Sequence, residues 1–107
     1  MSKFNHFETE LKQQLETYAA TIWKDYKSST LKEANEFALN TREDLKRWSI
    51  ALARGQLTRD DFAWLVESKR DLFHLETLKQ AGLSKVAIGR FINGVIDLVV
   101  TTALKTL

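Results

Sequence analysis

Residues 84–107, SKVAIGRFINGVIDLVVTTALKTL, form a strongly apolar segment at the carboxyl end of the chain. Its apolar side chains recur at steps of three and four residues, the spacing that places them on one face of an α-helix. In helical projection these side chains cover roughly 200° of arc, which is wider than a single neighbouring helix requires. The polar side chains gather on the remaining side and are Arg90, Asn93, Asp97, Thr101 and Lys105.

Length alone would allow this segment to cross a bilayer, but its composition argues against a membrane span. Arg90 and Asp97 interrupt the apolar run, whereas a spanning helix needs about 20 mostly apolar residues. We therefore expect no transmembrane segment, and we expect the apolar arc to be covered by the protein's own core or by another protein.

The rest of the chain also favours helices. Among its 107 residues there is no proline and there are only four glycines, so the turn signals of a many-stranded sheet are missing. The sequence predicts an all-α fold in a single domain, 1–107, with four antiparallel helices of similar length at about 3–27, 31–54, 58–81 and 84–107. Short connections between them favour an up-down-up-down bundle; two helical hairpins completed by dimerisation satisfy the same pattern.

Two Ser/Thr-x-x-acid patterns suggest where the second predicted helix lies. Thr30 and Glu33 fit a capping box, in which a hydroxyl and a carboxylate satisfy free amides at a helix start. Thr41 and Asp44 fit the same pattern after Asn40. The second helix is therefore expected to begin near Thr30, and an interruption near Asn40 stays open.

Stronger boundary signals occur in the second half of the chain. Gly55 and Gly82 can adopt the left-handed conformation that commonly ends a helix. Thr58 and Asp61 form a third capping-box pattern, and Ser84 is well placed to cap the last helix. These residues predict helix ends at Gly55 and Gly82 and helix starts near Thr58 and Ser84.

Charged residues interrupt the apolar stripe of the third predicted helix. Lys69 and Glu76 occupy positions where apolar residues would be expected, and an unpaired charge there would be costly. If the third and fourth helices form an antiparallel hairpin, Lys69 faces Asp97 and Glu76 faces Arg90. We therefore predict these two interhelix ion pairs, although a neighbouring turn or solvent could satisfy each charge instead.

Apolar residues outside the main stripes predict a surface for self-association, because a small chain that carries many of them tends to bury them in an oligomer. The candidate interface comprises Trp64, Leu75, Leu78, Ile88, Ile92, Val95 and Val99. We expect a homo-oligomer, with a dimer favoured, and an unidentified protein partner is compatible with the same surface.

The residues that usually carry chemistry are sparse. Asp71 and His74 have the Asp-x-x-His spacing of one helical face, but a carboxylate-bridged di-iron bundle needs a second such motif and further glutamates. We interpret them as a surface ion pair. The absence of cysteine excludes thiolate zinc sites and cysteine nucleophiles. The sequence predicts no catalytic, cofactor-binding or metal residue, and hence no enzyme and no cofactor.

Charge and the amino-terminal sequence limit the functional classes. Sixteen basic and fourteen acidic residues are interspersed, without the basic stripe that tracks phosphates, so no nucleic-acid partner is expected. The first residues do not resemble a secretory signal, so we expect a cytoplasmic protein. A non-catalytic interaction or self-association module fits best. The alternative is a helical module that binds a hydrophobic ligand or a membrane surface, and a metal-carboxylate bundle enzyme is less favoured.

Overall fold

The computed structural model describes residues 3–107, and this part of the chain is all-helical. The elements in chain order are α1 (Lys3–Thr21), the 3-10 helix η1 (Lys24–Tyr26), α2 (Lys27–Asn40), α3 (Arg42–Ala53), α4 (Arg59–Glu67), the 3-10 helix η2 (Arg70–Leu72), α5 (Leu75–Gln80) and α6 (Lys85–Thr106). The prediction of an all-α fold is confirmed. The four predicted helices of similar length are not found, because the second and the third are each divided into two shorter helices.

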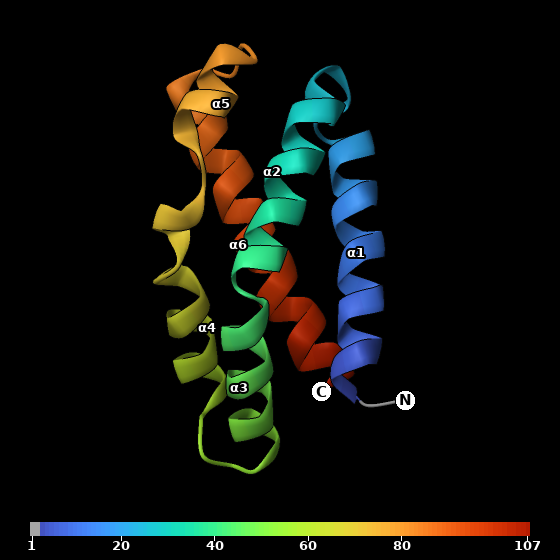
Figure 1. Cartoon of the computed structure of the whole chain (residues 1–107), viewed down its shortest axis with the longest axis vertical. Coiled ribbons are helices and arrows are strands. Elements are labelled where there is room, and N and C mark those ends of the chain that lie inside the picture. The colour runs from blue at the N-terminus through green and yellow to red at the C-terminus, as the bar shows by residue number, and fades with distance from the viewer. Residues whose placement is uncertain (1–2) are drawn as a thin grey trace.

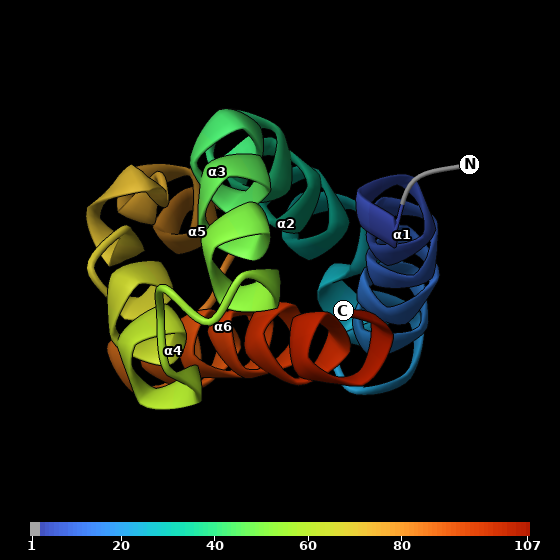
Figure 2. The same cartoon turned by 90° about the horizontal axis from the view of Figure 1, so that it is seen from below.

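The helices form an elongated arrangement in which α6 holds the others together (Figure 1). In this view α1 stands on one side, α2 and α3 follow each other down the centre, and α4 and α5 follow each other up the far side. The last helix runs obliquely behind them and packs against α1, α4 and α5. Figure 2 shows α6 lying along the lower side of this view, beneath α2 and α3, with α4 beside one end of it and α1 towards the other.

The oblique path of α6 explains how one chain covers its wide apolar arc. Because α6 contacts three other helices, apolar residues on several of its sides are buried. The buried residues of α6 are Ile88, Phe91, Ile92, Val95, Ile96, Val99, Thr102 and Ala103. Among residues 3–107, α6 is also the one helix long and apolar enough to cross a membrane, a property that the core helix of a soluble protein shares.

Aromatic rings connect the helices inside the core. Phe37 of α2 stacks on Phe73, with ring centroids 4.4 Å apart and planes 10° from parallel. Phe73 in turn meets Phe91 of α6 edge-on at 5.9 Å. On its other side Phe91 contacts Tyr18 and Trp23, near the end of α1. Such contacts add to the free energy of burial and tie four distant parts of the sequence to one centre.

Most of the strong boundary signals are confirmed. Gly55 and Gly82 have positive φ of 74° and 106°, and the hydrogen bonds of a Schellman motif surround each glycine. Thr58 and Asp61 form the predicted capping box. The Ser84 side chain accepts a hydrogen bond from the Ala87 N–H at 3.1 Å, so α6 begins where the sequence predicted.

The capping box predicted at Thr30 is wrong. Helix α2 already begins at Lys27, and the buried Thr30 hydroxyl donates to the Tyr26 carbonyl at 2.8 Å inside the first turns. Glu33 is also buried and points away from the helix start toward His74. The first predicted helix, 3–27, was also too long. Helix α1 ends at Thr21, and η1 connects it to α2.

Two interruptions divide the predicted second and third helices. The first, left open by the sequence, occurs at Thr41, whose hydroxyl donates to the Phe37 carbonyl at 2.8 Å. The second was not predicted and separates α4 from α5. Phe73 there is extended, with φ −73° and ψ 139°, and its ring packs on Phe37. The break has no glycine or proline, so core packing rather than a local signal accounts for it.

Candidate functional site

An apolar groove lies between α1 and the rod formed by α2 and α3. Its volume is about 600 Å³. Apolar side chains from the three helices line it, and these are Phe4, Phe7, Leu11, Leu15, Ala38, Leu39 and Leu45. Polar residues also contribute, namely Asn5, Glu8, Thr9, Lys12, Asn35 and Arg42. The combination of an apolar lining and a polar rim is typical of binding sites.

The interruption at Thr41 accounts for the position of the groove. Helix α1 packs along α2 and α6 but makes little contact with α3. In Figure 1 α2 lies close to α1 at the top of the view and moves away from it towards the junction with α3, and α3 stays apart from α1 below that junction. The apolar face of α1 in this region is therefore covered by α6 on one side and is left beside the groove on the other.

An ion pair joins two residues that line the groove on different helices. Arg42 Nε lies 2.7 Å from Glu8 Oε2, and a second guanidinium nitrogen lies 3.1 Å from Glu8 Oε1. The Arg42 guanidinium also lies 5.5 Å from the centre of the Phe4 ring. Hydrogen bonding to Glu8 and its negative charge raise the pKa of Arg42 above its ordinary value. This two-point contact fixes α1 relative to the start of α3.

One wall of the groove carries an unusually exposed apolar residue. Leu39, in the last turn of α2, is 69% exposed and belongs to the groove lining. Phe7, Leu11 and Leu15, by contrast, are almost fully buried. The groove thus combines a fixed apolar floor with a protruding side chain on its rim.

The candidate interface predicted from sequence is largely internal. Leu78 of α5 and four of its members on α6 are buried in the core, and these four are Ile88, Ile92, Val95 and Val99. Their assignment to a free surface is wrong, because α1, α4 and α5 pack against α6 and cover its apolar face. Trp64 is 70% exposed and Leu75 is 52% exposed, so these two residues do lie on the surface.

Both predicted interhelix ion pairs are replaced by other contacts. The Lys69 ammonium lies 3.1 Å from Asp44 of α3 and 5.8 Å from the centre of the Trp48 ring. Glu76 pairs within α5, with Lys79, at 3.7 Å. The prediction assumed an unbroken helix over 58–81, whereas the break between α4 and α5 changes the helical register. Asp97 and Arg90 both have exposed side chains.

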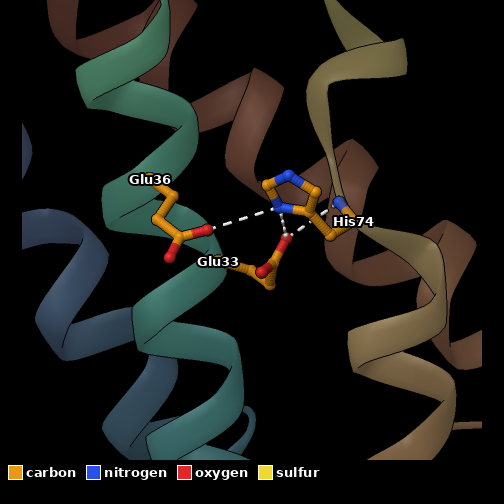
Figure 3. Close-up of side chains that lie close together, drawn as sticks. All are labelled: Glu33, Glu36 and His74. Carbon is orange, nitrogen blue, oxygen red and sulfur yellow. Dashed lines mark hydrogen bonds and ion pairs between the residues drawn. The ribbon is translucent and has the colours of Figure 1, made fainter.

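A polar cluster joins α2 to the start of α5 (Figure 3). The carboxylate of Glu33 accepts a hydrogen bond from the His74 backbone N–H at 2.9 Å. The same oxygen lies 3.2 Å from His74 Nδ1, and an oxygen of Glu36 lies 3.3 Å from that ring nitrogen. Asp71 is not the partner of His74 among residues 3–107, so the predicted Asp71–His74 pair is wrong.

Sequence reasoning missed this cluster although one signal was present. Glu33 and Glu36 are three residues apart and share a helix face, but the capping interpretation placed Glu33 at a helix start. No local pattern connects these two residues with His74, since 41 positions separate His74 from Glu33. Only the fold brings the imidazole and both carboxylates together.

Comparisons with protein-family models, with curated proteins and with solved structures found no match to this chain. The groove, the exposed residues and the polar cluster are therefore the features that bear on its function.

Proposed function

We propose that this chain is a non-catalytic interaction module that associates with a second copy of itself through the groove between α1 and the α2–α3 rod. The observation that carries the proposal is the position of Leu39, a 69% exposed apolar residue on the rim of an apolar groove. Covering both would remove apolar surface from water, which drives most protein association.

Leu39 and the groove complement each other in a two-fold pairing. In a dimer with two-fold symmetry the same surface patch is used twice, so Leu39 of each copy can enter the groove of the other. A protruding side chain adjacent to a groove on the same face is the arrangement that this symmetry requires. A dimer of this kind needs no rearrangement of the core.

The rim adds complementary charge. Glu8 and Lys12 both line the groove and are four residues apart on α1, which places them on the same face of the helix. When two α1 helices approach in antiparallel orientation, the Lys12 of each copy can approach the Glu8 of the other, which also binds Arg42 of its own chain. Charges at a rim contribute mainly to orientation and to the rate of encounter.

Sedimentation across a hundredfold dilution tests the proposal. We expect a concentration-dependent dimer in the wild-type chain. The variant Leu39→Lys should shift the equilibrium strongly to monomer without changing the fold, because Leu39 is already exposed. Trp64→Lys is the matched control, since Trp64 is equally exposed but lies outside the groove. A chain that remains monomeric at high micromolar concentration would refute the proposal, as would a dimer disrupted only by Trp64→Lys.

A hydrophobic-ligand module is the second candidate. The groove volume of about 600 Å³ lies within the range of small-molecule pockets, roughly 300–1,000 Å³. For this function a monomeric chain should bind an apolar fluorescent dye with one-to-one stoichiometry. Leu39→Lys should weaken dye binding, whereas Trp64→Lys should leave it unchanged.

A further inference from the structure

Glu33 presents a carboxylate in an environment that lacks a fixed cation. Its side chain is only 2% exposed. Within residues 3–107, neither Glu33 nor Glu36 forms an ion pair with a lysine or an arginine, and His74 is the cationic partner available to both. Buried carboxylates in proteins are normally paired with a cation or coordinate a metal.

The histidine cannot balance this charge. Both carboxylates approach the same ring nitrogen, Nδ1, at 3.2 and 3.3 Å. That nitrogen can carry one proton at most, so the ring has a single hydrogen to share between the two carboxylates that approach it. A divalent cation between the three groups would neutralise the cluster with a neutral imidazole.

The separations between the donor atoms match those of a metal site. For Zn²⁺, bond lengths of about 2.0–2.2 Å and a tetrahedral arrangement place neighbouring donor atoms roughly 3.3–3.5 Å apart. The distances from Nδ1 to the two carboxylates are close to this range, and the ligand atoms of all three residues lie within 4.8 Å of one another.

We propose that Glu33, Glu36 and His74 form a divalent-cation site of the zinc class, in which the metal fixes the start of α5 against α2. Two oxygen donors and one imidazole nitrogen favour Zn²⁺ over Mg²⁺ or Ca²⁺, which prefer oxygen ligands throughout. The side chains of His74 and Glu36 reach the surface, so water can supply the fourth ligand. Figure 3 shows the second ring nitrogen of His74 on the side away from both carboxylates, where it can donate to solvent.

Two independent signals test the site. Calorimetric titration of the full-length chain with ZnCl₂ should show one equivalent bound with a dissociation constant in the micromolar range or tighter. At a hundredfold excess over that constant, zinc should raise the melting temperature by at least about 5 °C. Magnesium at the same concentration should do neither.

Variants of the two histidines locate the binding. His74→Ala should weaken zinc binding by at least about tenfold to a hundredfold, the loss seen even when supporting residues of metal sites are changed. His6→Ala is the matched control, because His6 is the other histidine of the chain and lies exposed on α1; it should bind zinc like the wild type. Glu36→Gln serves as a second variant that retains the contact between Glu33 and His74.

A control for folding distinguishes the loss of a zinc ligand from the loss of structure. Circular dichroism identifies any variant that fails to fold, and if His74→Ala does so, Glu36→Gln decides. The proposal is overturned if the wild-type chain binds zinc no more tightly than about 100 μM. It is also overturned if the folded variants at His74 and Glu36 bind as the wild type does, or if His6→Ala abolishes binding.

Discussion

The contact between Gly94 and Tyr18 gives a sharp test of how α6 packs against α1. A Cβ atom added at Gly94 would lie 1.9 Å from the Tyr18 hydroxyl oxygen and 2.5 Å from the ring carbon that bears it. An ordinary contact between these atoms needs more than 3 Å, so the ring must move by more than about 1 Å. Gly89, on the same helix, has no such neighbour within 4 Å.

Moving the ring has a cost because Tyr18 belongs to the aromatic core. Its ring stacks on Phe91 at 6.2 Å and meets Trp23 edge-on at 6.4 Å. Overpacking of this kind destabilises by about 1–3 kcal/mol, and each weakened aromatic pair adds up to about 1 kcal/mol. Against this, replacing a helical glycine with alanine stabilises by about 1 kcal/mol. We expect Gly94→Ala to destabilise by about 1–2 kcal/mol.

The matched variant Gly89→Ala isolates the packing effect. It should stabilise by up to about 1 kcal/mol, since it receives the helical gain without the clash. Urea unfolding followed by circular dichroism at 222 nm measures the free energy of unfolding of both variants. The two values should differ by about 2–3 kcal/mol. In a Tyr18→Ala background the clash disappears, and Gly94→Ala should then be neutral or stabilising. Equal stability of the two single alanine variants would refute the packing argument.

The structure also makes predictions about a titration and a helix cap. Burial, the largest cause, and the negative charge of Asp97 raise the pKa of Tyr18 above its ordinary value, although the neighbouring Trp23 side chain opposes them. The folded state therefore keeps the Tyr18 proton at alkaline pH values at which the unfolded chain loses it, so stability should fall as the pH rises above about 10. Absorbance at 295 nm should show one of the two tyrosines titrating late, and Tyr18→Phe should remove that late step. Thr58→Ala should destabilise by about 0.5–2 kcal/mol in urea unfolding, because it removes the cap of α4. Thr9→Ala, on an exposed position of α1, should change stability by less than about 0.5 kcal/mol, and an equal loss in both variants would contradict the capping role.

Some features of the fold were readable directly from the sequence because they depend on short-range physics. The stops at Gly55 and Gly82 follow from backbone conformations that glycine adopts without strain. The starts at Thr58 and Ser84 follow from side-chain oxygens that satisfy nearby amides. All the atoms involved in each signal lie within a few residues of one another.

The helical nature of the last segment was also determined by the sequence, but the partners of its apolar face were not. Periodicity shows that Val95 and Val99 share a face and cannot distinguish a neighbour in the same chain from one in a second copy. The oblique path of α6 across α1, α4 and α5 resolves this, and the two valines lie in the core.

The residues of the proposed metal site come together only in the tertiary structure. The break before α5 has no glycine or proline, and packing of Phe73 on Phe37 accompanies it. That break places His74 beside Glu33 and Glu36, and it also directs Lys69 toward Asp44. The sequence by itself determined which segments are helical and where glycines and caps end them, since those effects are local. Which distant charges meet depended on the interrupted helices and their packing, since a small change in helical register redirects every side chain that follows.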